Sequence, residues 1–289
     1  MAYEAAIETY SGKVEEVTIG KGEDSLRVGG ETTLPFHFFE GRLPNPPKLA
    51  LEVSHQRQLD RSEEAFKAEI ISLQLLGTDA EGKDIEEIAA MTAEIVRSVG
   101  VPVIVYGTGE PERDRELLPK VAEACAGEGL LLGPVKKENY REIAAACLKY
   151  DHRLIAQTPL DVNATKQLNI MLTKEGISTD RIVIDPLSSA LGYGMEYSYS
   201  AMERIKLAAL AHNDKMLQMP IIANIGGECW KVKEAKEDDA QGVLWEGITA
   251  LCFILAGANI LILRSPHTYK LIQQILSKHL KNYDNREGY

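Results

Sequence analysis

Eight short apolar runs, rich in β-branched residues, recur along the chain from residue 48 onward. They are nearly continuous in hydrophobic residues instead of alternating, which is typical of strands buried on both faces of a parallel sheet. Longer and more polar segments separate them. We therefore predict eight parallel strands, at Lys48–Val53, Glu69–Leu75, Pro102–Gly107, Leu130–Val135, His152–Thr158, Arg181–Pro186, Pro220–Gly226 and Asn259–Ser265.

The segments between these runs carry apolar residues at helical spacing. One such stripe comprises Ile85, Ile88, Thr92, Ile95 and Val99. Eight strands alternating with helices indicate the α/β class and predict a (β/α)8 TIM barrel. A doubly wound open sheet is the alternative, but it requires a glycine-rich turn after its first strand. The residues 54–57 that follow the first predicted strand contain no glycine, so the barrel is favoured.

The residues before the barrel form a separate piece. Two strand-like segments flank Ser11-Gly12-Lys13, which predicts a β-hairpin within Glu4–Gly20. A proline-rich, extended lead-in follows at Thr33–Pro47. Because two strands alone are marginally stable, we expect the hairpin to cap the bottom of the barrel or to reach a partner. We assign residues 1–45 to the hairpin and lead-in, 46–280 to the barrel and 281–289 to a polar tail.

The charge of the chain limits its partners. The net charge of −11 over 289 residues argues against nucleic acid and against an anionic membrane, because both attract positive surfaces. Met1–Ser11 does not resemble a signal peptide. The longest apolar run, Ile248–Leu263, is interrupted by Gly257-Ala258-Asn259 and reads as a helix followed by a strand. We expect a cytoplasmic protein with no membrane partner.

The four cysteines show no metal-ligand spacing. Cys125, Cys147, Cys229 and Cys252 include no C-x-x-C pair, and most lie in apolar helical stretches. We interpret them as small buried hydrophobic residues. The sequence therefore predicts no metal ligands and no iron–sulfur cluster in this chain.

Candidate chemistry gathers where the predicted strands end, because (β/α)8 barrels carry their sites at that face. The set lacks a nucleophile paired with a histidine, so we expect no catalytic residue. Glu52 and Asp185 together would suit a hydrolase, which is a minor alternative. His152 begins a strand at the opposite face and is expected to be structural. The strand-end residues are Glu52, Gln74, Tyr106, Gln157, Asp185, Asn224 and Arg264.

Three loops at this face stand out. The loop after the fifth strand contains Asp161 and Asn163, which could bind a ligand or cap the next helix. The loop after the sixth strand carries Ser188 and the run Gly192-Tyr193-Gly194, whose glycines allow close approach of a ligand. After the eighth strand, Ser265-Pro266-His267 fits either a phosphate site or an N-cap serine with proline at the first helical position.

At these loops the sequence resembles a known family, the small (delta) subunit of the corrinoid iron–sulfur protein of the CO dehydrogenase/acetyl-CoA synthase system. The matching stretches follow one another over most of the chain. They are Leu34–Gly41, Leu51–Val53, Asp161–Asn163, Lys166–Ile170, Leu191–Tyr197, Met202–Ile205, Met216–Pro220, Trp230, Lys233–Ala235 and Leu244–Glu246.

The resemblance implies a heterodimeric methyl carrier. The large subunit would carry the iron–sulfur cluster and the corrinoid (cobalamin) domain, and this barrel would close over the corrinoid. A methyl-pterin methyltransferase and acetyl-CoA synthase would be transient partners in the Wood–Ljungdahl type of acetyl-CoA metabolism. Because a corrin is rimmed with carboxamides, the expected corrinoid contacts are Gln157, Asp161, Asn163, Asp185, Ser188, Gly192, Tyr193, Gly194 and Asn224.

Two departures from the family pattern affect helices. Only Ser54–Ala68 separates the first two strands, which predicts a shortened first helix near Ser62–Lys67. Pro119 falls inside the third helical pattern, so we predict that this helix starts late or kinks. Two other functions stay open: a pterin-binding methyltransferase barrel gripping its ligand with Asp185, Asn163 and Asn224, and a structural partner without ligand contacts.

Overall fold

The computed structural model describes residues 9–34, 41–54, 68–75 and 84–280. All eight predicted parallel strands are present, each within a residue or two of its expected bounds. They are β3 (Lys48–Val53), β4 (Ile70–Gln74), β5 (Val103–Tyr106), β6 (Leu131–Val135), β7 (Arg153–Gln157), β8 (Ile182–Asp185), β9 (Ile222–Asn224) and β10 (Ile260–Leu263).

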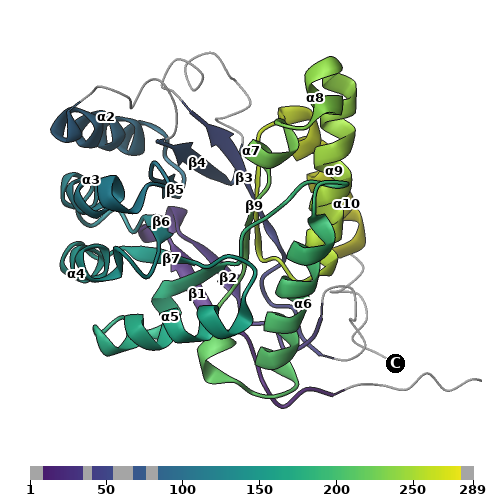
Figure 1. The fold of residues 1–289 in the computed structure, drawn as a ribbon, viewed down its shortest axis with the longest axis horizontal. Helices are drawn as coiled ribbons and strands as arrows, with labels where there is room; N and C mark the ends of the chain where they lie inside the picture. Colours follow the sequence, from purple (N-terminus) through teal and green to yellow (C-terminus); the bar gives the residue numbers. More distant parts are fainter. Residues whose placement is uncertain (1–8, 35–40, 55–67, 76–83, 281–289) are drawn as a thin grey trace, which may run out of the picture.

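Helices surround these strands on the outside (Figure 1). Their apolar stripes face the sheet, as in the first of them, where Ile88, Thr92 and Ile95 are buried. Residues 55–67, which include the predicted helix near Ser62–Lys67, lie outside the described residues. The helices are α2 (Ile85–Ser98), α3 (Pro111–Ala124), α4 (Tyr140–Tyr150), α5 (Val162–Lys174), α6 (Met195–Leu210), α7 (Gly226–Cys229), α8 (Lys233–Glu237), α9 (Asp239–Leu255) and α10 (Pro266–Leu280).

The strands follow the order β8-β7-β6-β5-β4-β3-β10-β9, so each strand lies beside its neighbour in the chain except at β3 and β10. The parallel pairing of β10 with β3 joins the two ends of the repeat. The remaining gap, between β8 and β9, is bridged by one parallel pair, Ile184 and Ile221. The predicted (β/α)8 barrel is confirmed, with its weakest seam between β8 and β9.

An N-terminal antiparallel hairpin is also present, but the predicted position within Glu4–Gly20 is wrong. Its strands are β1 (Glu16–Ile19) and β2 (Leu26–Gly29), joined through a short 3-10 turn at Gly22–Asp24. Part of the first strand that we had expected lies outside the described residues. Gly12 is not a hairpin turn: a Cβ there would lie 2.0 Å from the carbonyl oxygen of Ala209, so glycine is needed for close packing.

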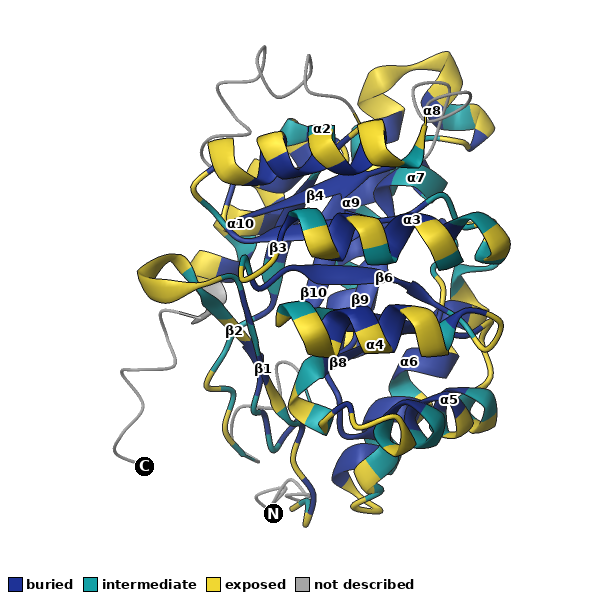
Figure 2. Ribbon diagram, turned by 90° about the vertical axis from the view of Figure 1, so that its left-hand side faces the viewer, coloured by how far each residue is buried: buried dark blue, intermediate teal, exposed yellow. Residues whose placement is uncertain are grey.

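The hairpin caps the bottom of the barrel, as expected (Figure 2). Val17, Ile19 and Val28 are fully buried in one cluster with the inward-facing side chains of the barrel strands. Each contributes roughly 1.5–3 kcal/mol of hydrophobic stabilisation. The backbone N–H of Gly20 donates to the carbonyl of Gly129, just before β6. The hairpin therefore acts as a plug that leaves the opposite end of the barrel for a site.

Of the two alternatives predicted for α3 at Pro119, the late start is wrong, and the kink stays a prediction. The helix begins at Pro111, which occupies the first turn where its missing N–H costs nothing, and runs through Pro119 to Ala124. Leu117, Leu118 and Val121 are fully buried beside Pro119. This packing outweighs the hydrogen bond that proline cannot donate.

Candidate functional site

The barrel mouth at the C-terminal ends of the strands is lined by polar side chains. Along each strand, side chains alternate between the barrel interior and the helices, so a residue two positions after an inward-facing apolar residue also faces inward. Ile104, Ile155 and Val183 belong to the interior cluster. The residues two positions after these three are Tyr106, Gln157 and Asp185, which the sequence analysis predicted as strand-end residues. The full inward-facing set is Glu52, Gln74, Tyr106, Gln157, Asp185, Asn224 and Arg264.

Asp185 is the centre of one half of this ring. Its Oδ2 accepts hydrogen bonds from Gln157 Nε2 at 2.8 Å and from the Tyr106 hydroxyl at 3.2 Å. Its Oδ1 accepts from the backbone N–H of Leu187 at 2.9 Å. Burial raises the pKa of Asp185, and these hydrogen bonds oppose the rise. The pKa of Tyr106 is raised well above its ordinary value by burial and by the nearby carboxylate. The three predicted residues thus form one network.

The second half of the ring is an ion pair. Arg264 donates from Nε and Nη2 to Glu52 Oε1, at 2.9 and 2.6 Å. Glu52 lies on β3 and Asp185 on β8, and each carboxylate has its own donors. Among the described residues no hydrogen bond joins Glu52 to Asp185, and these contacts give the minor hydrolase alternative no support.

Sequence reasoning missed Lys136, which directly follows β6 and therefore met the strand-end criterion used for the others. Its Nζ donates to the carbonyl oxygen of Gly109 at 2.7 Å, and its charge acts to lower the pKa of Asp185. Beside it lies a cavity of about 430 Å³, lined by Pro111, Lys136, Lys137, Glu138, Gln157, Thr158, Pro159, Ala164, Gln167, Leu168, Met171 and Leu187. The mouth thus extends sideways toward α5.

In the loop after β7, the capping interpretation of Asp161 is confirmed. Its Oδ1 accepts from the backbone N–H groups of Asn163 and Ala164, at 2.8 and 3.0 Å, at the start of α5. The side chain of Asn163 is exposed. Leu160, in the same loop, has a positive φ of 51° and donates its N–H to the carbonyl of Pro186, which ties this loop to the next one.

The loop after β8 is hydrogen-bonded to α9 and presents an exposed tyrosine. Trp245 Nε1 on α9 donates to the carbonyl of Leu191 at 3.1 Å. Gly192 and Gly194 have φ values of +78° and +99°, conformations that L-residues rarely adopt, so the backbone alone explains both glycines. Between them, Tyr193 is 51% exposed and its hydroxyl donates to Glu234 on α8. Ser188 Oγ is buried without a hydrogen-bond partner among the described residues.

In the corner after β10, the N-cap interpretation is confirmed. Ser265 Oγ accepts from the backbone N–H of Thr268 at 3.3 Å, and α10 begins at Pro266.

Cys125, Cys147, Cys229 and His152 are buried, as the sequence predicts, whereas the prediction is wrong for Cys252, which is partly exposed on α9. Burial raises the pKa of Cys125, Cys147 and Cys229 to about 12, so these thiols are poor nucleophiles and poor metal ligands. Within the described ranges, no three His, Cys, Asp or Glu side chains come together as a metal site. His152 is fully buried, accepts from the N–H of Leu130 and contacts the carbonyl of Ala122, and burial lowers its pKa.

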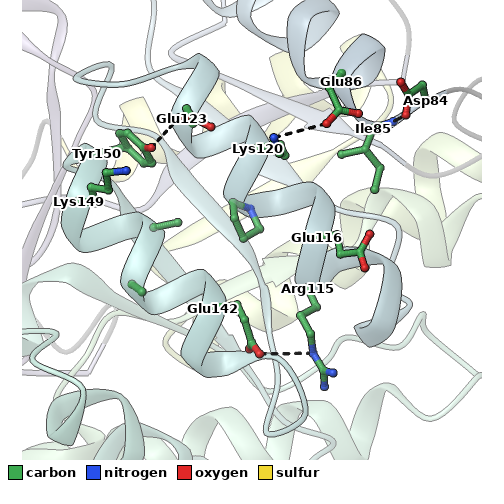
Figure 3. A pocket seen from close by; sticks show the side chains of 13 residues that line it. Asp84, Ile85, Glu86, Arg115, Glu116, Lys120, Glu123, Glu142, Lys149 and Tyr150 are labelled. Carbon is green, nitrogen blue, oxygen red and sulfur yellow. Dashed lines mark hydrogen bonds and ion pairs between the residues drawn. The ribbon is translucent and has the colours of Figure 1, made fainter.

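A larger hollow of about 680 Å³ lies on the outside of the barrel, over α2, α3 and α4 (Figure 3). Its charged side chains pair with one another: Lys120 with Glu86 at 3.4 Å, and Arg115 with Glu142 at 3.8 Å. The lining carries five carboxylates and three cations, so the hollow is net acidic, and its exposed ion pairs contribute little. The barrel mouth, where buried polar side chains form one network, is the candidate site. In the part of the chain that the structure describes, no helix is long and apolar enough to cross a membrane.

Comparison with known proteins gives a consistent result. A family model described as CO dehydrogenase/acetyl-CoA synthase delta subunit matches residues 16–285. Subunit delta 2 of the acetyl-CoA decarbonylase/synthase complex of Methanosarcina acetivorans is 33% identical, with 94% of this chain and 72% of that protein covered. Subunit delta from Methanothermobacter thermautotrophicus is also 33% identical, covering 97% and 79%. The first alignment has 314 positions against 289 residues here, so the relative carries segments that this chain lacks.

Solved structures with this fold include dihydropteroate synthases. The enzyme from Thermus thermophilus has a TM-score of 0.57 at 19% identity, covering 86% of this chain and 99% of that one. The enzyme from Xanthomonas albilineans in complex with 7,8-dihydropteroate has a TM-score of 0.53 at 17% identity, covering 86% and 96%. At such low identity the similarity establishes the barrel architecture alone.

Proposed function

This chain belongs to the CO dehydrogenase/acetyl-CoA synthase delta subunit family, and from that premise we propose that it is the small subunit of a corrinoid iron–sulfur methyl carrier. In this proposal it forms a heterodimer with a large subunit that holds the iron–sulfur cluster and the corrinoid domain. The barrel mouth faces the corrinoid, and a methyl-pterin methyltransferase and acetyl-CoA synthase bind transiently. When bound, the corrinoid supplies the cobalt that carries the methyl group.

The observation that carries this proposal is the exposed surface of the loop after β8 and of the first turn of α6. Tyr193 in the loop is 51% exposed although the loop is anchored to α9, and Tyr197 in α6 is 66% exposed. Tyrosine is favoured in protein interfaces, because one face of its ring is apolar and its hydroxyl still finds partners. Leu187, in the same loop, is 37% exposed with a positive φ of 66°, a conformation that costs on the order of 1–3 kcal/mol. A partner or cofactor that covers these side chains would explain why they are presented.

The side chains at the mouth also fit a corrin ring chemically. Its rim of carboxamides needs both donors and acceptors, and Ser188 Oγ is a buried hydroxyl without a partner among the described residues. Gln157, Asn163, Tyr193 and Asn224 supply further amide and hydroxyl groups. In this assignment Gly192 and Gly194 let the loop backbone approach the ring, while Asp185 orients Gln157 and Asp161 positions Asn163.

Co-purification tests the proposal. A tagged chain isolated anaerobically from its native cells should bring down a larger iron–sulfur subunit, with about one cobalt per heterodimer. Isolation of the chain with no cobalt-containing partner, under conditions that preserve the complex, would count against it.

A pterin-binding methyltransferase barrel is the second candidate, favoured by the buried carboxylate at the mouth. One similar fold is a dihydropteroate synthase in complex with 7,8-dihydropteroate, and a carboxylate suits the adjacent N–H groups of a pterin. However, Oδ2 of Asp185 already accepts from Gln157 and Tyr106, so a pterin that bonds to both carboxylate oxygens would have to displace at least one of these donors. Calorimetric titration with methyltetrahydrofolate separates the two functions, since micromolar binding to the isolated chain would favour the methyltransferase.

A further inference from the structure

The corner between β10 and α10 is where many (β/α)8 barrels bind a phosphate group. The free N–H groups at the start of a helix attract an anion there, and the helix dipole adds to the attraction. In this chain the corner consists of Arg264 and Ser265, followed by the 15-residue helix α10. It also adjoins the mouth, because the Arg264 side chain belongs to the polar ring.

Here the corner already holds a negative group from the protein itself. Glu246 on α9 is fully buried, and each of its carboxylate oxygens accepts one backbone N–H. Arg264 N donates to Oε1 at 2.6 Å, and Ser265 N donates to Oε2 at 3.1 Å. This two-point arrangement is the one by which a pair of N–H groups holds a bound phosphate or carboxylate. Burial raises the pKa of Glu246, while these hydrogen bonds act to lower it.

The other groups that an anion would use are also engaged. The guanidinium of Arg264 donates twice to Glu52 Oε1, so its charge is compensated. Ser265 Oγ accepts from the N–H of Thr268 as the cap of α10. A phosphate arriving at this corner would meet the carboxylates of Glu52 and Glu246, and like charges at short range repel it.

We infer that Glu246 is a built-in anion that occupies the phosphate position of this barrel, so the ligand at the mouth presents no phosphate to this corner. The identity of that ligand rests on the proposed function, in which a corrinoid would face β10 with its uncharged carboxamide rim. Its phosphodiester would then lie away from α10. Helix α9, which carries Glu246, also holds the loop after β8 through Trp245, so the adjacent pair Trp245–Glu246 fixes two loops of the mouth.

Binding of inorganic phosphate tests this inference directly. We expect phosphate, compared with chloride at equal ionic strength, to leave the amide NMR resonances of Arg264 and Ser265 in the wild type unchanged. Glu246→Ala vacates the position and frees both N–H groups, so it should bind phosphate at least about tenfold more tightly than the wild type by calorimetry. Asp239→Ala, which removes an exposed charge from the same helix, is the matched control and should behave like the wild type.

Either of two results would overturn the inference: saturable shifts of the Arg264 and Ser265 amides in the wild type, or a folded Glu246→Ala variant with no gain in phosphate affinity. If Glu246→Ala does not fold, Glu246→Gln takes its place, because its amide accepts only one of the two N–H groups. The wild-type NMR measurement decides in any case. Phosphate binding is read without corrinoid, so a wild-type chain that fails to hold corrinoid with its partner refutes the proposed function and leaves this inference standing.

Discussion

Replacing Lys206 by methionine should destabilise the protein by about 3–5 kcal/mol, because the change leaves the buried carboxylate of Glu31 without its cationic partner. Lys206 on α6 is 1% exposed and Glu31 is 2% exposed. Lys206 Nζ donates to Glu31 Oε1 at 2.5 Å and to Asn259 Oδ1 at 2.9 Å. Without the lysine, Glu31 keeps only the amide of Asn259 as a donor, at 2.8 Å, and its Oε2 has no partner among the described residues. The network joins the segment directly after the hairpin to the barrel.

Urea and thermal unfolding measure this effect. At about 2 °C per kcal/mol for a domain of this size, Lys206→Met should lower the melting temperature by roughly 6–10 °C. The double variant Lys206→Met/Glu31→Met removes both charges and should recover most of the loss. Lys233→Met, which breaks the exposed pair with Glu237, is the control and should cost less than about 0.5 kcal/mol. A loss below about 1 kcal/mol for Lys206→Met, or a double variant as unstable as the summed single variants, would refute the reasoning.

Three further predictions concern the mouth and the thiols. The pKa of Asp185 in the folded protein lies above its ordinary value of 3.8, so its contribution to stability falls as the pH rises from 3.8 through the folded-state pKa. Asp185→Asn should therefore gain stability relative to the wild type as the pH rises through this range. A difference in unfolding free energy that does not depend on pH would contradict this. Cys252, the one partly exposed thiol, should react first with a thiol reagent in the native protein, and faster labelling of another cysteine would show that burial does not control reactivity. Tyr193→Ala should reduce corrinoid retention by the heterodimer without changing its melting temperature. Leu255→Ala, at an equally exposed position, should leave retention unchanged. Equal retention by both variants would show that the loop after β8 is not part of the interface.

The strands and the mouth could be predicted because both follow from local pattern. A strand buried on both faces must be continuously apolar, so runs such as Val103–Tyr106 can be predicted as strands from the sequence. Once the strands are placed, their last inward-facing residues are fixed by the two-residue period. Tyr106, Gln157 and Asp185 were therefore predicted at the mouth, although the hydrogen bonds that join them were not.

The N-terminal hairpin shows where local pattern misleads. Ser11-Gly12-Lys13 has the composition of a turn, but Gly12 is required because the backbone of α6 passes against it. The real turn, Gly20–Ser25, contains two glycines, at residues 20 and 22, which were the signal available in the sequence. Both have a positive φ in the structure.

Contacts between distant segments could not be predicted from the sequence. Lys206 pairs with Glu31 across 175 residues, and nothing in the flanking residues of either marks them as buried partners. Glu246 likewise lies in an ordinary helical pattern, and its role depends on the two N–H groups that follow β10. Such long-range polar contacts depend on the folded barrel, so only the structure reveals them.

The central claim is that this barrel helps to hold a corrinoid at its mouth. The most direct test measures the rate at which corrinoid leaves the large iron–sulfur subunit, alone and after reconstitution with this chain, by following the corrinoid absorbance during gel filtration. The account predicts that the chain slows corrinoid release at least about tenfold, and that Tyr193→Ala removes part of this effect. Equal release rates with and without the chain, in a complex that still forms, would contradict the account and leave the barrel as a structural partner only.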